Sequence, residues 1–357
     1  MPLSKVRMHT AFWYAGAWGI FGAAYVAAIA FVSEGLDATV GSVVLVVAAG
    51  TRLATYVGAT AGELGFLRGF WLDASRRLSW LEDYAARSEM NATEPPPTKL
   101  HTGISFDHVS FRYPGTNKLI LDDVSVTLPA GKVVAIVGEN GAGKSTLVKL
   151  IARMYTPTAG RILADSLDIA TITTEGWRSK LAGAFQDFHR FEFPAQRTVG
   201  LGELEHLDNR PSAEVAVDRA GAGDVIDRLA YGLDTQLGAT WDDGADVSYG
   251  QWQKLALARG FMRSDPLVLI LDEPTSALDA ETEHALFERF ANASRSDTSN
   301  GRIVVLVSHR FSTVRMADVI IVLDGNHIAE VGSHETLVAN GGQYADLYAI
   351  QAAAYET

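Results

Sequence analysis

The stretch Gly138-Glu139-Asn140-Gly141-Ala142-Gly143-Lys144-Ser145-Thr146 decides the fold, because it fits the pattern G-x-x-x-x-G-K-[ST] at every position. The apolar run Val133–Val137 precedes it and predicts a buried parallel strand. Apolar residues follow it at helical spacing, at Leu147, Leu150, Ile151 and Met154. The sequence therefore predicts a strand, a glycine-rich turn and a helix in direct succession.

Such a turn is suited to a phosphate chain. It presents several backbone N–H groups to one anion, and the N-terminus of the helix adds a partial positive charge. In this pattern Lys144 reaches the β- and γ-phosphates, and the Ser145 hydroxyl ligates Mg²⁺. We therefore predict a binding site for a nucleotide and Mg²⁺, because the strand and the helix both stand where the pattern needs them. This loop alone does not show which class of P-loop protein the chain belongs to.

A pair of acids follows a second apolar run. Leu267–Leu271 predicts another buried strand, and Asp272 and Glu273 stand directly after it. Ligands bind at the carboxyl ends of the strands in open α/β sheets. A P-loop ATPase needs one carboxylate to hold Mg²⁺ and a second group to position or deprotonate the attacking water. Asp272 fits the first role and Glu273 the second.

The remaining pattern predicts an α/β fold, a P-loop ATPase core with a mainly parallel sheet. Ile303–Val307 reads as a further parallel strand, and Val319–Leu323 with Ile328–Val331 reads as a closing hairpin. Alternating segments near the start, at 104–106, 109–111 and 121–128, predict antiparallel edge strands. Residues from about 187 to 259 lack strand patterns, which predicts a helical insert.

Composition and charge narrow the class of protein. The 357 residues include no cysteine, which excludes a disulfide framework and a cysteine metal site. The formal net charge is −12. A nucleic-acid-binding protein would need a basic face for its phosphate partner, so we expect no nucleic acid among the partners.

The first part of the chain predicts a transmembrane helical hairpin. Ala11–Val32 is free of charged residues, and Thr39–Thr60 carries only Arg52; each is long enough for a bilayer core. Basic residues flank the pair and the short connection between the spans is acidic, so both ends are predicted to be cytoplasmic. We expect a multi-pass protein of a membrane, the bacterial plasma membrane, in contact with lipid. A cleaved signal peptide and a buried helical hairpin of a soluble domain are the alternatives.

The domain boundary is predicted at a run of prolines. Glu63–Met90 is amphipathic and reads as the second span continuing into the cytosol as a helix. Consecutive prolines favour an extended spacer. We therefore assign residues 1–94 to the membrane hairpin and its extension, 95–98 to a linker and 99–357 to the nucleotide-binding domain.

Residues 99–357 resemble the ATP-binding cassette (ABC) ATPases, since seven motifs of that family occur in its order. Besides the P-loop and the Asp272-Glu273 pair, the matching segments are Tyr113, like the aromatic that stacks on adenine; Gln186, like the Q-loop glutamine; Val247-Ser248-Tyr249-Gly250-Gln251, like the signature; Ser276-Ala277-Leu278-Asp279, like the D-loop; and Val307-Ser308-His309-Arg310, like the segment of the switch histidine.

The resemblance implies a division of labour. Two such domains would face head to tail, with ATP between the P-loop of one and Ser248, Gly250 and Gln251 of the other. Gln186 would sense Mg²⁺ and the attacking water, and His309 would contact the γ-phosphate and help to order Glu273. Asp279 of the D-loop-like segment would take part in binding the nucleotide. The chain is thus similar to the ATP-hydrolysing subunit of an ABC exporter, with a second subunit, identical or related, as its partner.

The chain departs from the family in two places. The signature carries Val247 for leucine and Tyr249 for its first glycine, so we expect hydrolysis to be retained at a reduced rate. Asp242-Asp243-Gly244 stands where such exporters usually carry a glutamate-arginine stretch that touches the membrane domain. Exporters of this type also have about six spans in each half. Two spans indicate either a shortened exporter half or a short subunit that needs other chains.

Two rival interpretations belong to other classes. One is a non-transporting ABC protein that acts on ribosomes or DNA, for which neither the spans nor the negative charge is typical. The other is a slow or inactive ABC subunit that uses ATP to clamp a partner chain. Tyr249 and the small number of spans favour that clamp, whereas Asp272, Glu273 and His309 favour hydrolysis.

Overall fold

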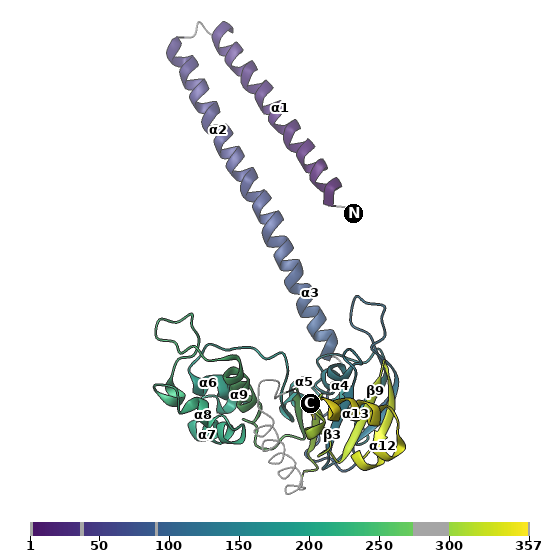
Figure 1. Ribbon diagram of the computed structural model, residues 1–357. Coiled ribbons are helices and arrows are strands. Elements are labelled where there is room, and N and C mark those ends of the chain that lie inside the picture. Colours follow the sequence, from purple (N-terminus) through teal and green to yellow (C-terminus); the bar gives the residue numbers. More distant parts are fainter. Residues whose placement is uncertain (1–2, 36–38, 90–91, 274–299, 356–357) are drawn as a thin grey trace. The chain divides into compact units, whose positions relative to one another are not determined.

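The computed structural model describes residues 3–35, 39–89, 92–273 and 300–355, which form two compact units, Met1–Ser88 and Glu89–Thr357 (Figure 1). The first unit is helical. It consists of α1 (Leu3–Gly35), α2 (Val40–Phe66), a π-helical segment (Leu67–Trp71) and α3 (Leu72–Glu89). The Tyr25 hydroxyl of α1 donates a hydrogen bond to the carbonyl of Val47 in α2, at 2.8 Å.

The second helix runs on from α2 through the π-helical segment into α3 with helical backbone angles, as the amphipathic pattern predicts. Within the described residues, Val40–Ala85 is the helix long and apolar enough to cross a membrane, with a mean hydropathy of 1.6 and none of its apolar window buried. Trp18–Glu34 is a shorter apolar helix. Thr51, Thr55 and Thr60 donate their hydroxyls to carbonyls four residues earlier, which satisfies these polar groups within the helix.

A six-stranded sheet is the centre of the second unit. Its spatial order is β10 (His327–Gly332), β9 (Val319–Asp324), β3 (Val133–Gly138), β8 (Ile303–Val307), β7 (Val268–Asp272) and β6 (Leu181–Ala184). The strands from β9 to β6 are parallel, and β10 joins β9 as the antiparallel arm of the predicted hairpin. The α/β prediction is confirmed.

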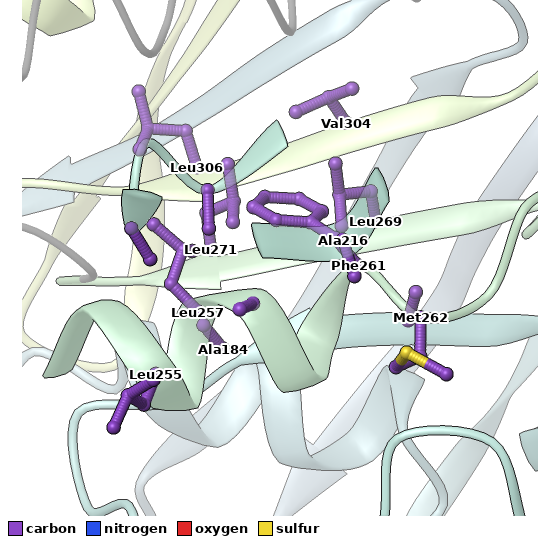
Figure 2. Packing of buried hydrophobic residues seen from close by; sticks show 14 of the residues in the cluster. Ala184, Ala216, Leu255, Leu257, Phe261, Met262, Leu269, Leu271, Val304 and Leu306 are labelled. Carbon is purple, nitrogen blue, oxygen red and sulfur yellow. The ribbon is translucent and has the colours of Figure 1, made fainter. Parts of the chain in front are cut away.

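The parallel strands are apolar throughout because both faces of the sheet are covered. Along β3, Val134 and Ile136 enter one core, and Val133, Ala135 and Val137 enter the other. The core that contains Val134 and Ile136 also includes side chains of the second sheet and of the helix α4 (Lys144–Ile151). The core that contains Val133, Ala135 and Val137 includes side chains of the helical insert. Figure 2 shows Leu269 and Leu271 of β7, Val304 and Leu306 of β8, and Leu257 of the insert in that core.

The second sheet is antiparallel, in the order β2 (Leu121–Pro129), β1 (Gly103–Phe111), β4 (Ala159–Ala164) and β5 (Leu167–Asp168). The two predicted segments 104–106 and 109–111 form one strand, β1, with a register shift between them. The expectation that they are edge strands is wrong, because β1 pairs with β2 on one side and β4 on the other. Alternation reports which face of a strand is covered, and it says nothing about how many neighbours the strand has.

The segment from 187 to 259 is helical, as predicted. Its helices are α6 (Ala195–Gly200), α7 (Arg210–Arg219), α8 (Gly223–Ile226) and α9 (Tyr249–Gly260), with single 3₁₀ turns at Leu204–His206 and Gly232–Asp234. Besides α4, the described part of the unit outside this segment contains the helices α5 (Thr174–Ser179), α11 (Phe311–Val314), α12 (His334–Asn340) and α13 (Gln343–Tyr355). The helix α4 ends at Ile151, so Met154, which we expected on its apolar face, lies beyond it with 47% of its surface exposed.

Candidate functional site

The glycine-rich loop joins β3 directly to α4, and its backbone needs glycine. Gly138, Gly141 and Gly143 have φ angles of +147°, +86° and +97°, a region that L side chains rarely adopt. At Gly138 the surroundings exclude a side chain as well, because a Cβ there would lie 2.3 Å from the carbonyl oxygen of Leu323. The loop is therefore shaped by its glycines. The Ala142 N–H donates to the Glu139 carbonyl within the turn, at 3.2 Å, and the N-terminus of α4 that follows favours an anion.

Lys144 is folded into this loop and only 8% exposed. Its Nζ donates to the carbonyl oxygens of Gly138 at 2.8 Å and Glu139 at 2.9 Å. Burial lowers the pKa of this amine, and the negative charges of Glu273 and Asp272 oppose that shift. The ammonium group is thus held at the centre of the loop, beside two carboxylates.

Ser145 and Asp272 meet at the end of the parallel sheet. The Ser145 hydroxyl donates to Oδ1 of Asp272 at 3.4 Å, and Asp272 is buried. Burial raises the pKa of the Asp272 carboxyl, and the hydrogen bond from Ser145 lowers it in part. A hydroxyl and a carboxylate are oxygen ligands of the kind Mg²⁺ takes, and Mg²⁺ usually keeps several waters and binds through one or two protein groups and phosphates. This pair fits such an ion without a third protein ligand.

Glu273 lies one residue beyond Asp272 and is fixed at both its backbone and its side chain. It has a φ of +46°, its N–H donates to the Val307 carbonyl at 2.9 Å, and its own carbonyl accepts from Nε2 of Gln253 at 3.4 Å. Gln186 donates from Nε2 to Oε2 of Glu273 at 2.9 Å, and Nδ1 of His309 lies 3.6 Å from Oε1.

The contacts of Glu273 join three parts of the chain that are far apart in sequence. Gln186 follows β6, Glu273 follows β7 and His309 follows β8, so each comes just after the carboxyl end of a strand of one parallel sheet. Such edges are where open α/β sheets bind their ligands. The structure thus brings the predicted catalytic residues together beside the P-loop.

Tyr113 also reaches the P-loop helix. Its hydroxyl lies 3.1 Å from Oγ1 of Thr146, and its ring packs edge-on against Phe111 and Tyr155. Sequence reasoning missed Tyr155, which follows α4 and has no pattern of its own to mark it. Phe111 is buried beneath the two tyrosines, and the partly exposed rings of Tyr113 and Tyr155 lie next to the loop, where a flat, apolar group such as a nucleobase can pack.

The signature-like segment begins helix α9. Ser248 is the N-cap residue: its hydroxyl accepts from the Gln251 N–H, and the Gln251 side chain accepts from the Ser248 N–H at 2.7 Å. Gly250 lies in the first turn. Among the described residues, no hydrogen bond joins this segment to the P-loop of the same chain, so its N–H groups are not used at that site.

Tyr249, the unusual residue of the segment, is 49% exposed, and its ring contacts residues just after Gln186. The ring centre lies 5.4 Å from that of Phe188 and 5.4 Å from the Arg190 guanidinium carbon. The side chain is therefore held toward the segment after Gln186. Asp279 and the D-loop-like segment lie outside the described residues.

Sequence reasoning also missed Gln253, which is buried in α9 and supports the Glu273 backbone. The sequence offers one signal for Gln253, which is a glutamine among the apolar residues of the helix face that is buried. A buried amide needs hydrogen-bond partners, so such a residue is expected to make a specific contact. Its partner lies 20 residues away, so the pattern alone does not identify the contact.

The loop, the acids and the sheet define a P-loop nucleotide-binding protein, and the comparisons specify the family. Residues 121–276 match a family model described as ABC transporter. The chain is 41% identical to an ATP-dependent lipid A-core flippase of Aromatoleum aromaticum, over 68% of this chain and 39% of that protein. It is 39% identical to the cyclolysin secretion/processing ATP-binding protein CyaB of Bordetella pertussis, over 74% of this chain and 36% of that protein.

A solved structure shares the fold over nearly the whole chain. It is that of a bacterial Atm1-family ABC exporter with ATP bound, with a TM-score of 0.73 and 29% identity, covering 98% of this chain and 60% of the other. The chain therefore contains an ATP-binding domain of the ABC transporter family, and it is similar to exporters of that family. It spans 39% and 36% of the two curated relatives named above.

Proposed function

We propose that the chain is the ATP-hydrolysing subunit of an ABC exporter, which uses ATP and Mg²⁺ at a site shared between two subunits to drive export across the membrane. The observation that carries this proposal is the placement of the Glu273 carboxylate between Gln186 and His309, beside the Ser145–Asp272 pair. A carboxylate held in this way can orient a water molecule and accept its proton.

Each residue of the site has a role that follows from its position. Lys144 and the N–H groups of residues 138–146 hold the β- and γ-phosphates, and Tyr113 stacks on the adenine. Ser145 and Asp272 hold Mg²⁺, with Gln186 at its edge, and the ion offsets the charge of the phosphates. Glu273 accepts the proton of the attacking water, and His309 keeps its carboxylate in place and contacts the γ-phosphate.

The second half of the site comes from the partner subunit. Ser248, Gly250 and Gln251 form the start of α9, where a hydroxyl, N–H groups and the helix dipole favour an anion. Because no hydrogen bond joins the described part of this segment to the P-loop of its own chain, we propose that it closes on ATP bound to the other subunit. Asp279 is proposed to take part in binding the nucleotide.

The helical unit is proposed to anchor the motor in the bacterial plasma membrane, with α1 and α2 as spans in contact with lipid and the ATPase in the cytoplasm. We propose that residues 1–94 form this part, that 95–98 are the linker and that 99–357 are the ATPase. Directly before the linker, Glu94 forms an isolated β-bridge with Ile172 within the second unit. Relatives named for lipid A-core, cyclolysin and subtilin share the ATP-binding domain, so the proposal concerns the motor and leaves the cargo open.

The test is phosphate release from ATP by the full chain in lipid nanodiscs. Glu273→Gln should lower turnover by at least about 100-fold and leave ATP binding intact, because it removes only the proton acceptor. Glu214→Gln, an exposed glutamate of α7, is the matched control and should leave turnover unchanged. Turnover that survives in Glu273→Gln, or ATP binding without turnover in the unaltered chain, would overturn the proposal; the second result would indicate the ATP-dependent clamp.

A further inference from the structure

The C-terminal helix α13 contacts the loop that carries His309. The Gln351 side chain spans this loop: its Oε1 accepts from the Phe311 N–H at 3.2 Å, and its Nε2 donates to the His309 carbonyl. Gln351 is 42 residues from His309 in sequence. One carboxamide therefore holds the backbone on both sides of Arg310, from a different element.

A group of aromatic side chains fastens the same loop to the same helix. Phe311 is buried, and its ring lies 5.3 Å from that of Tyr344 and 5.7 Å from that of Tyr348, both on α13. Tyr344 is fully buried and its hydroxyl lies 2.8 Å from Nδ1 of His334. Burial raises the pKa of Tyr344 to about 12, so this hydroxyl stays neutral at physiological pH. The helix α13 is thus a fixed support for the loop.

The loop connects the end of β8 at Val307 to the four-residue helix α11, and within it the Arg310 N–H donates to the Ser308 hydroxyl, at 3.0 Å. His309 is more than half exposed, and its imidazole lies 3.6 Å from Glu273. A shift of the loop backbone by about 1 Å would change that distance enough to affect a reaction that depends on geometry.

We propose that Gln351 is a positioning residue for ATP hydrolysis, which holds the backbone of His309 so that the imidazole stays beside Glu273. This inference rests on the proposed function, because it assigns His309 and Glu273 to the hydrolysis step. Gln351 contacts the loop on the side of its backbone, and none of its described hydrogen bonds reaches the P-loop. Its loss should therefore slow the chemical step and leave ATP binding unchanged.

The test uses Gln351→Met in the full chain in nanodiscs, because methionine keeps the length of the side chain and cannot make either hydrogen bond. The expected result is a kcat about 10-fold lower with the KM for ATP unchanged. Hydrogen exchange of the peptide around residues 309–313 should become faster, since the Phe311 N–H loses its acceptor. Ile350→Ala, at an adjacent and 68% exposed position of α13, should change none of these values.

A double variant separates positioning from a general loss of stability. In the His309→Ala background, Gln351→Met should cause no further fall in kcat, because both changes act on one contact. Two results would overturn the inference: an equal fall in kcat with and without His309→Ala, or a Gln351→Met variant with unchanged kcat and unchanged hydrogen exchange. In either case the proposed function would still stand if Glu273→Gln abolishes turnover. If the unaltered chain does not hydrolyse ATP, the proposed function and this inference both fail.

Discussion

At the scale of the residue, the phosphate-binding loop depends on positions where the backbone conformation or the surroundings favour glycine over any residue with a side chain. Gly138 combines a φ of +147° with a carbonyl oxygen directly where a Cβ would stand. Gly141 has a φ of +86° but open space around the same position. Substitution of each glycine by alanine therefore allows the cost of backbone strain alone, at Gly141, to be compared with the cost of strain and steric conflict together, at Gly138.

We predict that Gly138→Ala destabilises the chain by about 3 kcal/mol or more, because β3 and β9 must separate to admit the methyl group. Gly141→Ala should cost only about 1 kcal/mol, the backbone term alone. The measurement is the thermal unfolding midpoint of both variants without nucleotide. Equal midpoints would show that the contact with Leu323 does not constrain the loop.

The sequence identifies site residues correctly where they stand next to a recognisable strand or loop pattern. Lys144, Ser145 and Asp272 each stand beside a strand or loop with its own pattern, and the structure places all three together. Gln253 and Gln351 act through contacts 20 and about 40 residues away, and glutamine on a helix carries no signal for a distant partner. The structure was needed to identify them.

At the scale of the element, the parallel strands were predictable and the second sheet was only partly so. β3, β7 and β8 are continuous apolar runs because both of their faces are covered. The pairing of β1 with β4 was not predictable, because it depends on a segment about 50 residues later that has no alternation. Besides the backbone pairing of β1 with β4, the Asp165 carboxylate after β4 joins the two strands by contacts at the start of β1.

Asp165 accepts hydrogen bonds from the N–H groups of His101, Thr102 and Gly103, at 2.7 to 3.1 Å. Burial acts to raise the pKa of this carboxyl, but the three backbone hydrogen bonds outweigh it and hold the pKa below its ordinary value of 3.8. A carboxyl whose pKa is lower in the folded state stabilises the fold above its unfolded pKa. That contribution is lost as pH falls through the folded value.

We therefore predict that Asp165→Asn lowers the thermal unfolding midpoint at pH 7, and that this difference persists down to about pH 5 and narrows below about pH 4. Asparagine suits this site as a test because Asp165 has a φ of +54°, a conformation that asparagine tolerates. Thermal unfolding of both proteins across this range is the measurement. A difference that stays constant below pH 4 would contradict the role of the charge.

At the scale of the whole molecule, the two units are each understandable from their own sequence pattern. The first has long apolar helices with unburied side chains, and the second has a charged surface around two apolar cores. The site in the second unit holds the P-loop, the acids and His309, whereas the start of α9 has no described hydrogen bond to that loop. We propose that a second subunit, identical or related, supplies the other half of the site.

The most direct measurement combines two inactive forms of the full chain in the same nanodiscs. Lys144→Ala removes the P-loop amine and Ser248→Arg blocks the start of α9, so neither form alone should hydrolyse ATP. Mixed dimers contain one complete site, and random pairing should restore about a quarter of the unaltered turnover. Recovery of that activity is the result we predict. A mixture as inactive as its two components would contradict a site shared between two copies of this chain.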